Sequence, residues 1–173
     1  MNNRKYIIKL DDYKDYLKFT NIDIQKNCKW IYNIIDKKSN QNKILYEDKN
    51  FVLIMRRHMK PDKISTFHLL AFPKDKNIKS IRDLNADHIP LLKNMVKKSK
   101  EYIKKIYNIE KDEIEANFHY LPTVLLLHIH FELIFNKKMK RLFKEHSVNS
   151  VIQNLEIDSN YYKKVKIEII KKL

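Results

Sequence analysis

The sequence contains no glycine, although a soluble chain of 173 residues would ordinarily hold about a dozen. Glycine-rich phosphate loops, dinucleotide-binding loops and nucleophile elbows all need glycine, for close backbone approach or for a positive φ. These three kinds of site are therefore excluded. If the chain binds a phosphate, side chains and ordinary backbone must hold it.

Cysteine and long apolar runs are also scarce. Cys28 is the only cysteine, which excludes a disulfide within the chain and a cysteine-rich zinc site. No apolar run approaches the ~18 residues of a transmembrane helix, and residues 1–5 lack the apolar run of a signal peptide. We therefore expect an intracellular protein that does not associate with a membrane. The expected location is the cytoplasm, with the nucleus as a second location.

The composition is that of a globular protein with a strong positive charge. Apolar residues make up 43% of the chain and aromatic residues 11%, which suffices for one domain with its own core. The formal net charge is +15, which favours polyanions such as RNA. Most of this charge is lysine in a chain also rich in asparagine and isoleucine, so the base composition of the coding genome is an equal alternative explanation.

The strongest chemical pattern lies in residues 125–132, where two histidines interrupt an apolar segment. Side chains alternate between the two faces of a β-strand, so His128 and His130 should share one face while Leu127, Ile129 and Phe131 share the other. Buried imidazoles need a polar partner. This pair is the main candidate for catalysis.

Hydrophobic periodicity predicts an α+β fold. An amphipathic helix is expected from about Asn85 to Tyr107, with Pro90 in its first turn, and a second, C-terminal helix from about Ser147 to Leu155. We expect an antiparallel sheet of about five or more strands, with the long helix packed on one face. The predicted strands are residues 43–47, 51–56, 66–72, 112–120 and 124–135. The tail at 160–173 fits either a strand or a helix.

The His128–His130 segment resembles the histidine triad superfamily, in which three histidines alternate with apolar residues on one strand. The flanking residues resemble the C-terminal domain of scavenger mRNA decapping enzymes over about residues 29–165. The resemblance implies a histidine-triad-like domain over 29–173, preceded by a short arm, 1–28, that could form an edge element. The matching blocks are Trp30–Lys38, Phe51–Ile54, Ser80–Leu84, His119–Thr123 and Ile152–Glu156.

The resemblance implies a hydrolase that cleaves 7-methylguanosine cap dinucleotides or short capped RNA fragments, with no cofactor and no metal. His128 would attack the phosphate nearest the methylated nucleoside and form a covalent nucleotidyl-histidine. His130 would bind the scissile phosphate and help to protonate the leaving group, and His119 would contact the phosphates. Trp30 would stack on the methylated base. The family acts as a homodimer, so a homodimer is expected.

The chain also departs from the family pattern. Leu126 stands where the first histidine of the triad is expected, which leaves a degenerate triad. Asn40 replaces a glutamate that reads the guanine edge, and Arg56 places a positive charge where an acid would face the cationic base. His58 falls where a lysine is expected and could donate to a phosphate. Lys144, in a lysine-rich segment, is a further candidate phosphate ligand.

Several alternatives stay open at the level of sequence. His128 and His130 could be core histidines bonded to backbone carbonyls, and Trp30 could be a core anchor. His119, His128 and His130 could converge on zinc. His68, in a predicted central strand, is expected to be structural. The whole domain could be a catalytically impaired cap-, nucleotide- or RNA-binding module, or a basic protein that binds RNA through its lysines alone.

Overall fold

The computed structural model describes residues 6–21, 25–38, 44–60, 63–134 and 144–172. Six strands form one fully antiparallel sheet in the order β2-β3-β4-β6-β5-β7. They are β2 (Ile44–Glu47), β3 (Phe51–Met55), β4 (His68–Pro73), β5 (Ile114–Tyr120), β6 (Ile129–Leu133) and β7 (Lys144–Ser147). The predicted α+β fold with an antiparallel sheet is therefore confirmed.

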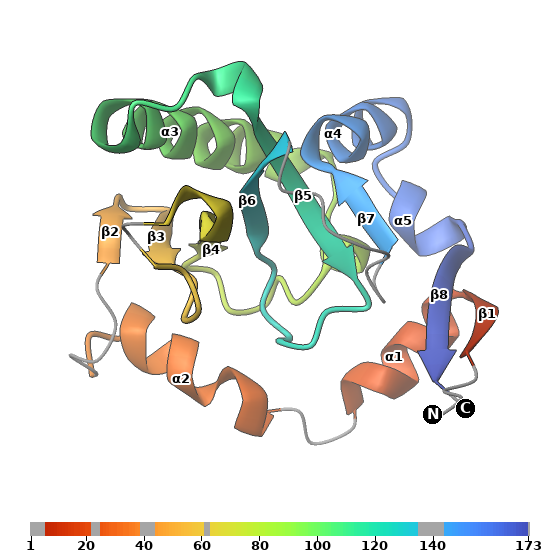
Figure 1. Ribbon diagram of the computed structural model, residues 1–173. Coiled ribbons are helices and arrows are strands. Elements are labelled where there is room, and N and C mark those ends of the chain that lie inside the picture. Colours follow the sequence, from red (N-terminus) through yellow and green to blue (C-terminus); the bar gives the residue numbers. More distant parts are fainter. Residues whose placement is uncertain (1–5, 22–24, 39–43, 61–62, 135–143, 173) are drawn as a thin grey trace, which may run out of the picture.

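The helices cover both faces of this sheet (Figure 1). The long helix α3 (Ile89–Tyr107) and the C-terminal helix α4 (Val148–Ile157) pack on one face, as predicted. Helix α2 (Gln25–Ile35) packs on the opposite face, over β3 and β4. The sequence analysis did not anticipate this second layer. The expected boundary between an arm and a domain, at residues 28 and 29, falls inside α2.

Two chain segments near the ends of the sequence pair with each other. Strand β1 (Tyr6–Asp11) runs antiparallel to β8 (Ile167–Lys172), and α1 (Tyr13–Asn21) and α5 (Tyr161–Lys164) lie beside this small sheet (Figure 1). The described part of the arm before α2 is thus a strand and a helix, and the strand pairs with the tail. The tail contains a short helix and a strand, so both readings of its pattern apply to different parts of it.

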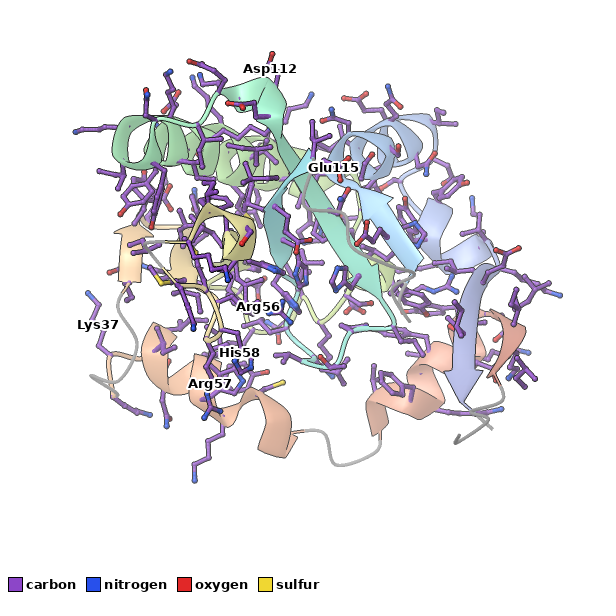
Figure 2. The ribbon with its side chains drawn as sticks, in the orientation of Figure 1. Lys37, Arg56, Arg57, His58, Asp112 and Glu115 are labelled. Atoms are coloured by element: carbon purple, nitrogen blue, oxygen red, sulfur yellow. The ribbon has the colours of Figure 1, made fainter. Side chains whose placement is uncertain are left out.

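Within the described ranges, two residues take the left-handed backbone conformation that glycine usually occupies. Lys37, labelled in Figure 2, follows α2 with φ 57°, and Asn108 caps α3 with φ 53°. Asparagine tolerates this conformation better than most residues, and helices often end in it. The chain therefore ends two of its helices without glycine.

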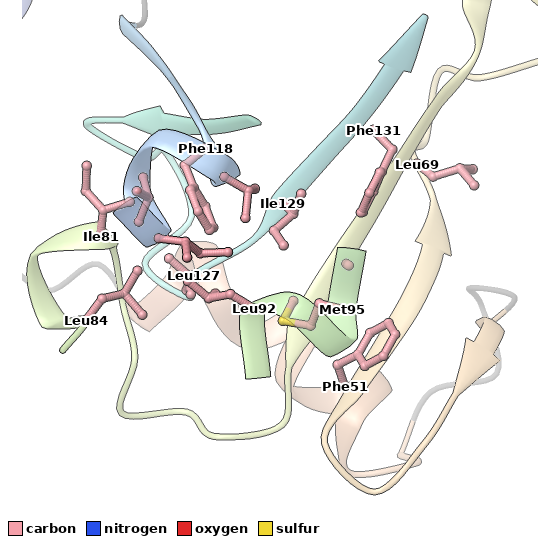
Figure 3. Packing of buried hydrophobic residues seen from close by; sticks show 14 of the residues in the cluster. Phe51, Leu69, Ile81, Leu84, Leu92, Met95, Phe118, Leu127, Ile129 and Phe131 are labelled. Atoms are coloured by element: carbon pink, nitrogen blue, oxygen red, sulfur yellow. The ribbon is translucent and has the colours of Figure 1, made fainter. Parts of the chain in front are cut away.

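The main core lies between the sheet and helices α3 and α4 (Figure 3). Alternate residues of the strands, such as Phe51, Leu69 and Phe131, pack against Leu92 and Met95 of α3. The residues between them point the other way. On β3 and β4 these are apolar and lie under α2, except His68 at the start of β4, whereas on β5 and β6 they are largely polar. Helix α2 thus covers one half of that face and leaves the polar half as the candidate site.

A fully buried arginine joins the small sheet to the main body. The side chain of Arg82 is 0% exposed, and its guanidinium donates to the Tyr120 hydroxyl and to the backbone carbonyls of Asp11, Tyr162 and Val165. Its Nη2 also lies 3.5 Å from the Asp11 carboxylate. Three segments distant in sequence, at residues 11, 120 and 162–165, are therefore tied to one charged group.

Candidate active site

His128 lies immediately before β6, not inside the strand as the sequence analysis expected, because regular pairing begins at Ile129. The expected alternation of faces still holds. Leu127, Ile129 and Phe131 enter the main core, while Leu126 is buried in the cluster under α2. The backbone is extended enough to keep the alternation without the ladder bonds of a strand.

The ring of His128 is held in one tautomer by the backbone. Its Nδ1 lies 2.8 Å from the carbonyl oxygen of Leu126, and since a carbonyl can only accept, Nδ1 must carry the proton. Burial lowers the pKa of His128 to about 4, so the ring is neutral at pH 7. Among the described residues no hydrogen-bond partner faces Nε2, and this nitrogen keeps its lone pair. The alternative of a core histidine bonded to a backbone carbonyl therefore describes only Nδ1. Nε2 keeps a lone pair that can act as a nucleophile.

His130 is the centre of a cluster of imidazoles. Its Nδ1 lies 2.8 Å from His68 Nε2, and its ring stacks on His119 with centroids 3.6 Å apart. The His128 ring lies 4.8 Å away, centroid to centroid. Burial, together with the neighbouring His128, His119, His68 and Arg56, lowers the pKa of His130 well below its ordinary value. Its Nε2 is buried, with no hydrogen-bond partner among the described residues.

His68 is the site residue that sequence reasoning missed. It was expected to be structural, yet β4 pairs with β6 so that His68 stands opposite Glu132 and beside His130. Its Nδ1 lies 2.7 Å from Glu132 Oε1 and 3.1 Å from Arg56 Nη1. The register between β4 and β6 creates these contacts, and no local pattern in the sequence encodes that register.

His119 contributes from β5, the strand on the other side of β6. It stacks on His130 and lies 3.6 Å from Glu145 of β7, measured from Nε2 to Oε1. The ligand atoms of His119, Glu132 and Glu145 all lie within 4.8 Å of one another. Because Glu132 already accepts from His68 and Glu145 faces His119, we assign no metal to this cluster. The zinc set considered from sequence, His119, His128 and His130, is not the one that the geometry groups.

Trp30 reaches the same region from α2. Its indole is 38% exposed and meets Phe72 edge-on, with centroids 5.8 Å apart. Phe72 in turn stacks on His128 at 4.9 Å. Trp30 is therefore held against the sheet through Phe72 and stays partly exposed near the candidate nucleophile, which suits it to stack on a base.

Arg56 and His58 leave the end of β3 on the α2 side of the molecule, together with Arg57 (Figure 2). Both side chains are exposed, and they line a pocket of about 190 Å³ that also contains His68 and Glu132. A cationic pocket thus adjoins the imidazole cluster. Of the other predicted ligands, Asn40 lies outside the described residues. The backbone of Lys144 opens β7, and its side chain is outside the described part of the structure.

The geometry brings together His128, His130, His119, Trp30 and Arg56, which the sequence analysis named, and adds His68 and Glu132. Residues 29–148 match the family described as "Scavenger mRNA decapping enzyme C-term binding". The chain belongs to this family.

Relatives in the scavenger decapping family extend over most of the chain. The m7GpppX diphosphatase of Rattus norvegicus is 33% identical over 163 residues, which are 89% of this chain and 47% of that protein. The m7GpppX diphosphatase of Ascaris suum is 32% identical over 179 residues, covering 94% of this chain and 60% of that protein. The chain spans about half the length of the curated relatives that it matches.

Among solved structures, a Hit-like protein from Bartonella henselae aligns with a TM-score of 0.46 and 17% identity, covering 77% of this chain and 93% of that one. The family match confirms the expected histidine-triad-like fold. Within the described ranges, no helix combines the length and the apolar composition needed to cross a bilayer.

Proposed function

We propose that this chain hydrolyses the polyphosphate bridge of 7-methylguanosine cap dinucleotides or short capped RNA fragments, with His128 as the nucleophile. The observation that carries the proposal is the hydrogen bond from His128 Nδ1–H to the Leu126 carbonyl. This bond leaves Nε2 unprotonated, with its lone pair available for attack. Relatives of about one-third identity are m7GpppX diphosphatases. A neutral imidazole is a competent nucleophile at phosphorus near pH 7.

The attack forms a bond from His128 Nε2 to the phosphorus nearest the methylated nucleoside. The bond from that phosphorus to the bridging oxygen breaks, and a nucleoside diphosphate leaves with the electron pair. The cation created on the imidazole is stabilised by the hydrogen bond from Nδ1 to Leu126. Water then attacks the same phosphorus and releases the nucleoside monophosphate and His128.

The surrounding side chains supply donors for the phosphates and a surface for the base. His119 and His130 lie side by side next to His128, and Arg56 and His58 line the adjoining pocket. Negative charge builds on the phosphoryl oxygens in the transition state, so cationic and donating groups favour the reaction. The exposed indole of Trp30 is suited to a cationic methylated purine through stacking and cation–π attraction.

The setting of the reaction is part of the proposal. The net charge of +15 attracts capped RNA fragments. We take the working form to be a homodimer, because two-fold dimers are the commonest assemblies of soluble proteins. We place the protein in the cytoplasm, and also in the nucleus, where capped fragments arise inside the cell.

The decisive experiment compares wild type with His128→Asn on the cap dinucleotide m7GpppG. Wild type should release GDP, and alkali-stable label from the phosphate next to 7-methylguanosine should appear on the protein. His128→Asn should do neither, whereas His88→Asn, in the 3₁₀ turn before α3, should behave as wild type. Equal rates for wild type and His128→Asn would remove His128 from the mechanism. Cap binding by calorimetry without any GDP release from wild type would show a non-catalytic binding module instead.

A further inference from the structure

Three side chains form a continuous hydrogen-bonded chain across β6 and β4. Glu132 Oε1 lies 2.7 Å from His68 Nδ1, and His68 Nε2 lies 2.8 Å from His130 Nδ1. His68 and His130 are 4% and 7% exposed, so these bonds are shielded from competing water. The chain ends at His130 Nε2, a buried nitrogen without a partner among the described residues.

The direction of this chain follows from its acid end. An ionised carboxylate only accepts, so the proton between Glu132 and His68 belongs to His68 Nδ1. In a neutral ring His68 Nε2 is then bare and accepts from His130 Nδ1–H, which leaves the lone pair of His130 on Nε2. Arg56 Nη1 also lies near His68 Nδ1, at 3.1 Å, and would require the opposite direction. The Glu132 contact is shorter, which favours the first arrangement.

We propose that Glu132 and His68 are positioning residues for His130, and that they fix its Nε2 as the base that accepts a proton from the hydrolytic water. This inference rests on the proposed function, because it assigns roles within the second half of that reaction. As in a catalytic triad, a carboxylate orients an imidazole, which here orients a second imidazole that acts as the base. The two imidazoles come from the neighbouring strands β4 and β6. Stacking on His119 fixes the plane of the His130 ring, and the hydrogen bond to His68 fixes the orientation of the ring within that plane.

In the proposed step, a water oxygen attacks the phosphorus of nucleotidyl-His128 while one of its protons passes to His130 Nε2. The P–N bond breaks, and its electron pair returns to His128 Nε2. His130 becomes an imidazolium whose charge is stabilised through Nδ1–H, His68 and Glu132. Release of the proton from His130 Nε2 to solvent restores the starting state.

Leu126 occupies the first position of the triad motif, where the family has a histidine, and the structure shows what this leucine contacts instead. Leu126 is buried in the apolar cluster under α2, so this position supports the helix instead of the phosphate site. A third imidazole still reaches His130, from β4. His130 therefore contacts three other imidazoles, those of His128, His119 and His68, and the last two lie outside the His128–His130 motif.

The first test reads the hydrogen-bond direction without any turnover. In protein labelled with ¹⁵N-histidine, two-bond ¹H–¹⁵N correlations should show His68 and His130 each protonated on Nδ1 and bare on Nε2, with assignments from His68→Gln and His130→Gln. A His68 proton on Nε2, with Nδ1 bare toward Arg56, would overturn the proposal.

The second test uses m7GpppG labelled at the phosphate next to 7-methylguanosine, with an alkaline quench. For His68→Phe and Glu132→Gln, kcat should fall about 10²-fold, the typical contribution of one proton-transfer group. KM should fall with it, because kcat/KM reports the attack by His128, which these variants leave intact. Label on the protein should rise toward one equivalent per site, because attack by His128 persists while the water step slows. Glu47→Gln, which contacts Lys74 on the far edge of the sheet, is the matched control and should match wild type.

The outcomes separate this proposal from the function on which it rests. Variants with wild-type kcat, or with low kcat and no added label, would overturn the positioning role while the hydrolase stands. If wild type neither turns over nor takes up label, the proposed function fails. The NMR result then still decides the direction of the hydrogen-bonded chain. Glu132→Gln keeps the size of the side chain, so it gives a folded comparison if His68→Phe does not fold.

Discussion

Trp30 and His128 both contact the ring of Phe72. Trp30 meets it edge-on from helix α2, and His128 stacks on it from the segment before β6. Phe72 is 0% exposed and cannot move away without opening the cluster under α2. A base stacked on Trp30 would therefore be held at a fixed position relative to the nucleophile, through one intervening aromatic side chain.

Replacing this indole should weaken cap binding. In Trp30→Ala, KM for m7GpppG should rise roughly tenfold to a hundredfold, since stacking of a base on an aromatic side chain contributes about 1–3 kcal/mol. Trp30→Phe should retain most of the affinity because it keeps a ring. Steady-state kinetics on both variants check this, and an unchanged KM in Trp30→Ala would leave Trp30 as a helix anchor only.

Arg56 should reduce the preference for a methylated cap. The base of 7-methylguanosine is cationic, and the Arg56 guanidinium repels it while leaving unmethylated guanine unaffected. In Arg56→Asp, the ratio of kcat/KM for m7GpppG to that for GpppG should rise about thirtyfold, because the charge changes by two units and each exposed unit acts by about 1 kcal/mol at contact distance. Arg57→Asp, one residue further along the chain, is the control for net charge. Equal ratios in the two variants would show a general charge effect.

Burial of His128 should make stability depend on pH. Its pKa is about 4 in the folded protein and near 6.5 in the unfolded chain, so the unfolded chain binds the proton first as the pH falls. The free energy of unfolding should therefore decrease from about pH 6.5 down to pH 4, by roughly 3 kcal/mol from this group. Urea unfolding of wild type and His128→Asn at pH 7 and pH 4.5 measures the difference. His130, whose pKa is also lowered, acts in both proteins. An identical pH dependence in the two would contradict the prediction.

Arg82 should be a major stability determinant far from the chemistry. In Arg82→Met, the Tyr120 hydroxyl, three carbonyls and the Asp11 carboxylate lose a buried donor. The expected loss is about 3–5 kcal/mol, as for breaking a buried ion pair. Lys97→Met, at an exposed position of α3, should change stability by less than about 0.5 kcal/mol. Chemical denaturation compares the two variants, and a small loss for Arg82→Met would show that the small sheet attaches mainly by other contacts.

The sequence predicted the sheet and the helices α3 and α4 because their apolar residues recur with clear strand or helix spacing. Strand β7 was not predicted, since Lys-Glu-His-Ser has no apolar alternation and pairs only as an edge strand. Helix α2 was missed because its apolar stripe is short and mixed with polar residues. Its place on the sheet face opposite α3 and α4 depends on contacts with β3 and β4.

The site shows the same division between local and long-range information. The motif around His128 and His130 is contiguous, so the two histidines and their shared face could be predicted. The partners of His130 come from β4 and β5, and only the strand order and register place His68 and His119 beside it. The site roles of Asn40 and Lys144 stay predictions.

The absence of glycine also acts on the unfolded chain. Glycine has the greatest backbone freedom of any residue, so a chain without it has fewer unfolded conformations to give up on folding. In the native state the effect is opposite at Lys37 and Asn108. Both residues have a left-handed backbone conformation, which carries a steric penalty for any residue with a Cβ atom. Lys37 is consequently the position where introducing a glycine would relieve backbone strain, even though that change makes the denatured ensemble larger.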